Sequence, residues 1–334
     1  MTKRSLAAIG VRHGHCWGIL EGLKRTKKVE LAAVAEDHPE MRKAVRRRLG
    51  DVPLYTDWRK CLDEVEPDVV ALVTRNFVKQ KVVCECFRRG IGVFADKPIF
   101  TEKRWLQKAE ALWKKARRKP ALSALLGLRA GGAGFALKRI VDRGELGDIV
   151  HVYKCRPHRL RPESRRSWEL NNRENGGPII DLASHDVDYA MWLIGSEPTE
   201  VTAYARLARF RKLKGFWDNA QVMVRFKSGA VLMVEADWLT PEKSRYHGDC
   251  RTMVTGTEGF AEIYEPLRLL KVTTSKRAER TVKPRARTFN LYDDFLAQCE
   301  GRAKWLTAEE VFKLHRVLIA ATESAKHNGR TITF

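Results

Sequence analysis

Apolar stretches of strand length alternate with helical stretches throughout the first 126 residues of the chain. The strand-like runs lie at residues 5–9, 30–35, 68–74, 92–95 and 121–126, and helical patterns at 14–23, 39–49, 57–65, 78–89 and 102–118 separate them. Strands separated by helices at this rhythm predict an α/β domain with a parallel, doubly wound sheet. The ligand of such a sheet binds outside the carboxyl ends of its strands.

The first strand-like run is followed by Gly10, and the residues after it predict a turn that binds a dinucleotide. With Gly10 as the first glycine of a G-x-G-x-x-G turn, Arg12 takes the place of the second glycine and His15 that of the third. The second glycine normally lets the backbone approach a pyrophosphate, so the Arg12 side chain must turn away or bind a phosphate. An ordinary turn between strand and helix is the alternative interpretation.

Two carboxylates, Glu36 and Asp37, follow the second strand and favour NAD over NADP. They lie roughly 20–25 residues after the turn, where a carboxylate reaches the hydroxyls of the adenosine ribose. The 2′-phosphate of NADP would be repelled there unless a Lys or Arg intervened, and none is adjacent in sequence. The residues expected to bind the cofactor along this edge are Gly10, Arg12, His13, Gly14, His15, Glu36, Asp37, Thr74, Asn76 and Lys97.

The second part of the chain changes to a mostly antiparallel pattern. After a helix at 134–143, strand-like runs lie at 149–156, 199–206, 220–227, 231–238, 250–255 and 261–265, and helices at 291–300 and 307–328 close the chain. Residues 227–230 are typical of a hairpin turn. This pattern predicts an α+β domain. We therefore expect a dinucleotide-binding domain at residues 1–126 and a domain for substrate binding and dimerisation at 127–334.

A helix predicted at residues 175–195 carries the clearest catalytic pattern. Asp181, His185 and Asp188 are spaced i, i+4 and i+7, so their side chains would share one helix face. A carboxylate one turn from an imidazole can hold and orient a general base. The alternative is a core helix whose histidine has only structural partners.

The net charge is +22, from 63 Lys and Arg residues against 41 Asp and Glu residues. Basic residues occur along the whole chain, whereas a nucleic-acid-binding arm would concentrate them in one place. We therefore expect a solvated basic surface and no specific nucleic-acid partner. Attraction of anionic substrates or polyanions is the alternative.

The seven cysteines form no C-x-x-C pair, so neither a disulfide framework nor a zinc site is predicted. No secretory signal precedes the first strand, and no run reaches the ~20 apolar residues that a membrane span needs. We expect a cytoplasmic protein with no membrane contact and no metal.

These stretches together resemble the Gfo/Idh/MocA family of nicotinamide-dependent oxidoreductases over nearly the whole chain. Residues 69–98 are similar to the family's strand, its T-P-N-x-x-H segment and its E-K-P signature, which is D-K-P here. The family's G-G-x-x-x-D-x-x-x-H-x-x-D helix is matched by Gly176, Gly177, Asp181, His185 and Asp188. The co-occurrence of D-K-P and D-x-x-x-H at this separation is the specific part of the resemblance.

The chain departs from the family pattern at four positions. Arg12 replaces a glycine of the phosphate turn, and Asp96 replaces the usual glutamate. Arg75 and Lys79 stand where the family has proline and histidine, which adds positive charge. The basic residues that suggest an anionic substrate, such as a sugar acid or phosphate, are Arg75, Lys79, Arg156, Arg159, Arg161, Arg165 and Arg166.

The resemblance implies a Rossmann domain, a C-terminal α/β domain and a nicotinamide cofactor. We also expect a homo-oligomer, dimeric or tetrameric. The resemblance also implies that His185 takes the hydroxyl proton of a sugar or cyclic polyol while hydride leaves the same carbon. Lys97 would stabilise the developing alkoxide, and Asp181 would orient the substrate or the histidine. The alternatives are a glycosidase that oxidises its substrate only transiently and a regulator that binds cofactor without catalysis.

Overall fold

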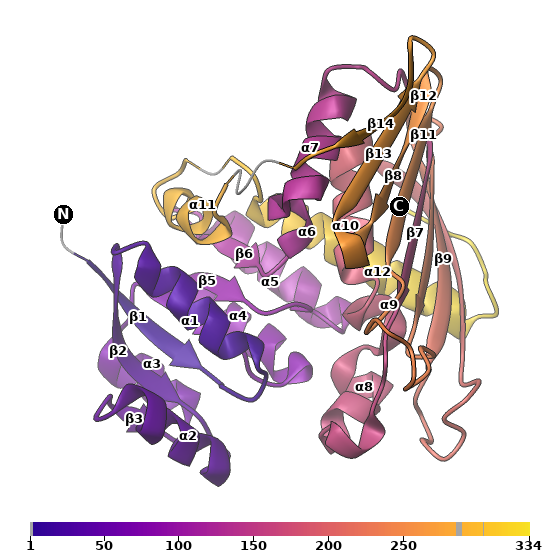
Figure 1. Ribbon diagram of the computed structural model, residues 1–334. Coiled ribbons are helices and arrows are strands. Elements are labelled where there is room, and N and C mark those ends of the chain that lie inside the picture. The colour runs from indigo at the N-terminus through magenta and orange to yellow at the C-terminus, as the bar shows by residue number, and fades with distance from the viewer. Residues whose placement is uncertain (1–2, 285–288, 303) are drawn as a thin grey trace. The chain divides into compact units, whose positions relative to one another are not determined.

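A computed structural model describes residues 3–284, 289–302 and 304–334 (Figure 1). Its contacts divide the chain into two compact units, Met1–Leu125 with Asn290–Lys313, and Leu126–Phe289 with Leu314–Phe334. Residues 290–313 therefore belong to the first unit, although we expected them in the second domain. Residue 126 as a boundary between domains that fold independently stays a prediction.

The first unit is built on a six-stranded parallel sheet with the strand order β3-β2-β1-β4-β5-β6. Its strands are β1 (Arg4–Ile9), β2 (Val29–Ala35), β3 (Leu54–Tyr55), β4 (Val69–Leu72), β5 (Gly92–Ala95) and β6 (Leu122–Ala124). This confirms the predicted doubly wound sheet. The two-residue edge strand β3 was not predicted, because it is too short to show a periodic pattern.

Helices bury apolar residues in the first unit, and all but the last of them lie between two strands of the sheet in sequence. They are α1 (His15–Arg25), α2 (Pro39–Leu49), α3 (Trp58–Val65), α4 (Asn76–Arg88), α5 (Lys103–Lys115) and α11 (Leu291–Gln298). All residues of β4 and β5 are buried, which explains why these strands are continuous apolar runs. In α11, Phe295 packs edge-on against Phe94 of β5 with ring centroids 5.5 Å apart.

The second unit contains a nine-stranded sheet with the order β14-β13-β12-β11-β7-β10-β9-β8-β15. Its strands are β7 (Ile149–Pro157), β8 (Pro198–Arg206), β9 (Asn219–Phe226), β10 (Val231–Asp237), β11 (Arg251–Gly256), β12 (Gly259–Tyr264), β13 (Leu269–Thr274), β14 (Arg277–Val282) and β15 (Ile332–Thr333). All neighbours are antiparallel except β7 and β10. The mostly antiparallel sheet is confirmed, and β13, β14 and β15 are strands that the sequence pattern did not predict.

Helices cover one face of this sheet in the second unit (Figure 1). They include α7 (Gly132–Asp142) and α10 (Ser184–Ile194), preceded by the short helices α6 (Gly127–Ala130), α8 (Asn172–Asn175) and α9 (Gly177–Asp181). Residues of β9 alternate between buried and exposed, as expected for a sheet with one covered face. The long helix α12 (Ala308–Lys326) runs from residues of the first unit into residues of the second. Among the described residues, no helix is long and apolar enough to cross a membrane.

Gly10 directly follows β1, where the backbone of the first unit leaves no room for a side chain. Its φ is +80°, and a Cβ there would lie 2.5 Å from the Thr74 Cα and 2.6 Å from the Thr74 Cβ. Gly14, four residues later, has a φ of −57° and open space around its Cβ position. An alanine should therefore lower the stability of the protein at Gly10 but not at Gly14.

We predict that Gly10→Ala lowers the free energy of unfolding by about 1–3 kcal/mol, because the methyl group meets Thr74 in a left-handed backbone conformation. Gly14→Ala is the matched control and should leave stability unchanged or raise it by up to ~1 kcal/mol. Chemical denaturation of both variants measures the difference. Equal losses of stability would contradict the close approach of Gly10 to Thr74.

Candidate active site

The carboxyl ends of four parallel strands bring the predicted cofactor residues of the first unit to one edge. Gly10 follows β1, Glu36 follows β2, Thr74 lies two residues after β4, and Asp96 follows β5. The amide of Gly10 donates to the Ala35 carbonyl at 2.8 Å, which joins the ends of β1 and β2. This edge is where a doubly wound sheet binds its ligand.

The turn between β1 and α1 fits the pyrophosphate of a dinucleotide. Gly10 allows the close turn beside Thr74 at the end of β1, and α1 begins at His15 after Gly14 with no acidic residue in its first turn. A helix N-terminus of this kind attracts phosphate through its unpaired amides and its dipole. A cavity of about 330 Å³ lies beside the turn and is lined by residues that include Gly10, Glu36, Asp37 and Thr74. The residues present therefore fit NAD.

Arg12 binds the two carboxylates that follow β2. Its Nε donates to Glu36 Oε1 at 3.2 Å, and its Nη2 donates to Asp37 Oδ1 at 2.5 Å. Glu36 is buried, and its Oε2 also accepts the Val11 amide at 2.8 Å. Arg12 thus turns towards the acidic pair, which is how the turn accommodates an arginine at the second glycine position.

A second arginine reaches the same acidic pair from the end of β4. Arg75 Nη2 lies 3.7 Å from Asp37 Oδ2. Our reason for preferring NAD included the absence of a neighbouring cation in the sequence. The fold removes that premise, because Arg12 and Arg75 are both brought to Asp37.

Asp96 is the centre of a polar cluster at the end of β5. One carboxylate oxygen lies 3.0 Å from His15 Nδ1, and the other lies 3.5 Å from His13 Nδ1 and 3.7 Å from Lys79 Nζ. Burial would raise the pKa of Asp96, but the Lys79 charge and the hydrogen bond with His15 hold it well below its ordinary value. Burial lowers the pKa of His13 to about 4 despite the opposing Asp96 charge, so this imidazole is neutral at pH 7.

The same cluster places three potential metal ligands close together, with the ligand atoms of His13, His15 and Asp96 within 4.8 Å of one another. The Lys79 ammonium already lies beside the Asp96 carboxylate, so a divalent cation would meet its repulsion. We therefore assign this cluster to positioning the turn and not to metal binding.

Lys79 holds the loop that carries Lys97. Its buried ammonium donates to Asn76 Oδ1 and to the Asp96 carbonyl, each at 2.9 Å. It also donates to the carbonyls of Lys97 and Pro98 at 3.4 and 3.3 Å. We expected the Lys79 charge near a substrate, but its ammonium instead binds backbone carbonyls of the protein. Lys97 is half-buried at the same edge.

In the second unit, the predicted helix at residues 175–195 is divided into short segments. Asp181 is the last residue of α9, and His185 lies in the first turn of α10. The amides of Leu182 and Ala183 both bond to the Pro178 carbonyl, at 3.1 and 3.0 Å, which interrupts the regular i to i−4 pattern. Leu182 and Ala183, which separate the two segments, both keep helical dihedral angles, and the side chains of Asp181 and His185 are half-buried. A shared face for Asp181 and His185 stays a prediction.

Buried ion pairs anchor α10 through Asp186 in its first turn and Asp188 two residues later. Asp186 accepts bonds from Arg156 Nε at 2.5 Å and Nη2 at 2.9 Å, and Lys154 Nζ lies 3.1 Å from it. Asp188 accepts two bonds from Arg129, at 2.7 and 2.9 Å. Burial would raise the pKa of Asp186, but the Arg156 and Lys154 charges lower it to about 2.

The sequence interpretation did not single out Lys154 or Arg129, or the pairing of Asp186. A signal for Lys154 and Arg156 was present, because they occupy alternate positions of β7 that the strand pattern turns inward. Arg156, which we considered for an anionic substrate, is committed to Asp186 and Glu265.

Three further arginines before the central helix also have partners within the protein. Arg159 donates to the Tyr246 carbonyl at 2.7 Å, Arg161 to Glu242 at 3.2 Å and Arg165 to the Leu160 carbonyl at 3.1 Å. These contacts weaken the case for an anionic substrate that the sequence suggested.

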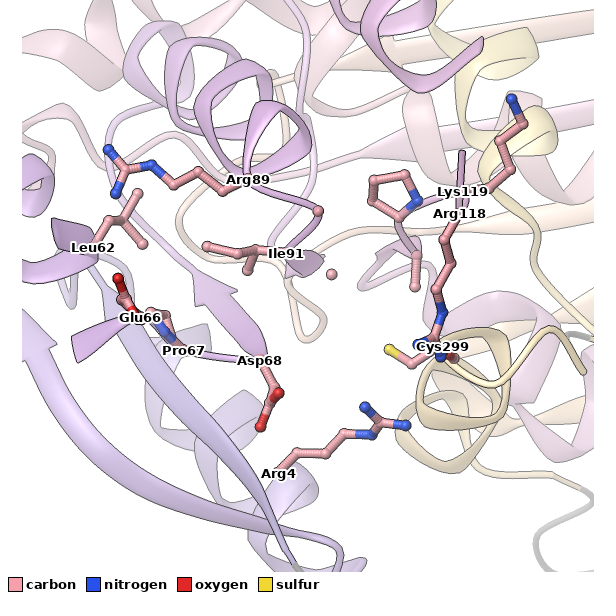
Figure 2. Close-up of a pocket in the computed structure, with 14 residues that line it drawn as sticks. Arg4, Leu62, Glu66, Pro67, Asp68, Arg89, Ile91, Arg118, Lys119 and Cys299 are labelled. Atoms are coloured by element: carbon pink, nitrogen blue, oxygen red, sulfur yellow. The ribbon is translucent and has the colours of Figure 1, made fainter. Parts of the chain in front are cut away.

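A second cavity of the first unit, about 490 Å³, lies at the opposite, amino edge of the parallel sheet (Figure 2). The guanidinium groups of Arg4 and Arg118 lie on the same side of it, near Cys299. Arg118 Nη2 donates to the Cys299 carbonyl at 2.6 Å. Because ligands of parallel sheets bind at the carboxyl edge, we assign no cofactor role to this cavity.

Two curated relatives and a solved structure show what the chain is similar to. The scyllo-inositol 2-dehydrogenase (NAD(+)) of Bacillus subtilis is 28% identical over 64% of this chain and 60% of that protein. A scyllo-inositol 2-dehydrogenase (NADP(+)) of the same organism is 24% identical over 86% of this chain and 85% of that protein. The structure of a levoglucosan dehydrogenase in complex with NADH superposes with a TM-score of 0.84 at 20% identity, over 99% of each chain.

Two family models cover most of the chain. Residues 9–125 match the oxidoreductase family with an NAD-binding Rossmann fold, and residues 136–262 match the GFO/IDH/MocA C-terminal domain. The chain therefore belongs to the Gfo/Idh/MocA family of oxidoreductases, and its first unit is the family's NAD-binding Rossmann domain.

Proposed function

We propose that this protein is an NAD-dependent dehydrogenase that oxidises a hydroxyl-bearing carbon of a sugar or cyclic polyol. The observation that carries the proposal is the set of hydrogen bonds from the Lys79 ammonium to the carbonyls of Asp96 and Lys97. These bonds hold the loop with Lys97 at the edge where the dinucleotide turn lies. The names of the relatives, which act on inositols, support this substrate class. Bound NAD supplies the hydride acceptor.

The catalytic residues of this proposal are Lys97, Asp181 and His185. His185 accepts the hydroxyl proton, as a positioned general base. Lys97 stabilises the developing negative charge on the oxygen by a charge-assisted hydrogen bond. Asp181 orients the substrate or the imidazole. The cofactor contacts proposed are those of Gly10, His13, Gly14, His15, Glu36, Asp37, Thr74 and Asn76, with Arg12 acting through the acidic pair.

The buried pairs around α10 support the role of His185. The side chains of Asp186 and Asp188 are tied to Arg156 and Arg129, so the segment that carries His185 has a fixed position within the second unit. A general base needs such fixed geometry, because proton transfer requires hydrogen-bond contact with the reacting hydroxyl.

A neutral polyol or sugar is the substrate that the charges favour, because most of the basic residues considered for an anionic substrate bind carboxylates or carbonyls of the protein. Steady-state assays with inositols, neutral sugars and sugar acids test this, followed by the absorbance of the reduced cofactor. Sugar acids turned over far more efficiently than neutral compounds would contradict it.

We also propose the cytoplasm as the compartment. All seven cysteines are free thiols, which is typical of a reducing environment. Burial raises the pKa of Cys86 and of Cys16, so these thiols stay protonated and unreactive.

We predict that His185→Ala lowers turnover by ~10²–10⁴, the range for a positioned proton-transfer group, while the affinity for NAD changes little. His327→Ala, which removes an exposed histidine in the turn directly after α12, is the matched control and should leave turnover unchanged. The measurements are steady-state kinetics, cofactor titration and thermal melting. A folded His185→Ala enzyme with normal turnover would remove His185 from the mechanism, and a general loss of stability would indicate a structural histidine.

The open face of the second sheet supports the proposal of a homo-oligomer. Met233 of β10 is in register with Met223 of β9 and Tyr153 of β7, and Tyr153 is in register with Met253 of β11. We call these four side chains the open-face band. Acidic and basic side chains, including Glu235, Arg251, Glu262 and Lys271, lie on the same face, so two copies can match opposite charges by symmetry.

We predict that the protein is at least a dimer at micromolar concentration and that Met233→Lys disrupts it, because the ammonium would be buried at the centre of the open-face band. Ser228→Lys, in the exposed turn between β9 and β10, is the control with the same added charge. Sedimentation velocity measures the assembly state. A monomeric wild-type protein, or an unchanged assembly of the Met233 variant, would refute the proposed interface.

A further inference from the structure

The amino ends of four parallel strands surround the cavity of about 490 Å³ in the first unit (Figure 2). Arg4 begins β1, Asp68 precedes β4, Gly92 begins β5, and Ala121 precedes β6. Strands β4 and β5 have four residues each, so this edge lies on the order of 13 Å from the carboxyl edge. A cavity of this volume can hold a small organic molecule. Such a molecule would not reach the dinucleotide turn at the other edge.

Two guanidinium groups converge at one end of this cavity, next to Cys299 (Figure 2). Arg4 comes from β1, and Arg118 comes from the loop that precedes β6. Burial raises the pKa of the Cys299 thiol to about 11, and the charges of both arginines oppose that rise, so both charges lie close to the same sulfur. Two like charges held this close repel each other, and an anion bound between them relieves the repulsion.

Most hydrogen-bond donors of these two guanidinium groups are not used by the described part of the chain. Within residues 3–284, 289–302 and 304–334, the Arg118 side chain makes one hydrogen bond, from Nη2 to the Cys299 carbonyl, and the Arg4 side chain makes none. Arg4 Nη2 lies 3.8 Å from Glu300 Oε1, beyond hydrogen-bond distance, and Glu300 itself binds Arg302. Each guanidinium has five N–H donors, so several remain for the oxygens of an anion.

Two carboxylates, those of Glu66 and Asp68, line the same cavity away from Cys299 (Figure 2). Asp68 Oδ2 accepts the Ser5 amide at 2.8 Å, which holds this carboxylate beside β1. A carboxylate repels a second anionic group but accepts hydrogen bonds from hydroxyl groups. A ligand that satisfies both ends of the cavity therefore has one anionic group and a hydroxyl-bearing skeleton.

We propose that this cavity is a binding site for a hydroxylated phosphate monoester, such as a sugar phosphate, with its phosphate between Arg4 and Arg118. The two guanidinium forks supply N–H donors for the phosphate oxygens. The carboxylates of Glu66 and Asp68 accept hydroxyl hydrogens of the same molecule. This site is separate from the site of the proposed function, and its test requires no dehydrogenase activity.

The probes are glucose 6-phosphate, adenosine 5′-monophosphate, glucose and inorganic phosphate. The first two are hydroxylated phosphate monoesters, whereas glucose lacks the phosphate and inorganic phosphate lacks the hydroxylated skeleton. Calorimetric titrations at one near-physiological ionic strength limit non-specific attraction by the net charge of +22. We expect at least one ester to bind with a dissociation constant of about 1 mM or tighter. Glucose and inorganic phosphate should bind roughly tenfold or more weakly.

The two esters distinguish the sources of such a phosphate, because the one that binds more tightly identifies the skeleton that the site accepts. Adenosine 5′-monophosphate also resembles half of NAD, and glucose 6-phosphate resembles a sugar substrate. Binding is therefore assigned to this cavity by variants of its own side chains.

The decisive variants are Arg4→Gln and Arg118→Gln, each of which replaces one guanidinium by a neutral polar group. Each should weaken binding of the ester roughly ten- to a hundredfold, the range for hydrogen bonds to a charged group. Arg4 is half-buried and Arg118 is exposed, and thermal melting verifies that each protein is folded. Ester binding that persists when both arginines are replaced together would overturn the proposal.

The matched control is Lys119→Gln, which removes the same charge from the same cavity. The Lys119 ammonium binds the Lys114 carbonyl, and its side chain points away from Arg4 and Arg118 (Figure 2). The ester should therefore bind this variant within about threefold of the wild-type affinity. Equal losses in the control and in the two arginine variants would reduce the effect to general electrostatics and contradict the assigned phosphate position.

Asp68→Asn tests the end of the cavity assigned to the hydroxyl groups. It removes a negative charge and keeps an oxygen for the Ser5 amide, so inorganic phosphate should bind more tightly. The preference for the ester over inorganic phosphate should fall roughly threefold or more. The proposal is wrong if neither ester binds the wild-type protein, or if inorganic phosphate binds as tightly as the esters. An unchanged preference in the Asp68 variant would refute the role of this carboxylate.

Discussion

The buried ammonium of Lys79 is the contact on which the candidate site of the first unit depends. A charge taken out of water is costly unless it is paired and hydrogen-bonded. Lys79 meets this requirement with the Asn76 side chain, the carbonyls of Asp96, Lys97 and Pro98, and the nearby Asp96 carboxylate. Because this ammonium needs hydrogen-bond acceptors, it ties α4 to the end of β5 and fixes the position of the Lys97 backbone.

In the second unit, buried carboxylates are paired and hydrogen-bonded for the same reason. Asp186 and Asp188 are both buried, and each is paired with an arginine through two hydrogen bonds. Bidentate pairing restricts orientation as well as distance. These pairs therefore help to fix the orientation of α10 against β7 and α6.

Many of the basic residues that give the chain its high net charge are paired within the protein. Arg12 and Arg75 neutralise Asp37, Arg156 and Lys154 neutralise Asp186, and further arginines bind backbone carbonyls. The basic residues nearest to the predicted catalytic segments are therefore part of the protein's own hydrogen bonding. A charge of +22 describes the solvated surface more than it describes a binding site for anions.

The sequence by itself determined the main strands and helices of the first unit and the edge where the cofactor residues meet. The alternation of apolar and helical stretches encodes a parallel sheet, and Gly10, Glu36, Thr74 and Asp96 follow its strands. These features are local, because periodicity and turn residues act within a few positions of each other. The proposed roles of Lys97, Asp181 and His185 stay predictions that came from the motif resemblance.

Tertiary structure alone decided which partner each charged residue has. Arg12 and Glu36 are 24 residues apart, Arg156 and Asp186 are 30 apart, and Arg129 and Asp188 are 59 apart. No local pattern encodes such pairs, because the free energy of an ion pair depends on burial and distance in three dimensions. For the same reason the sequence placed no cation beside Asp37, whereas the fold brings two arginines to it.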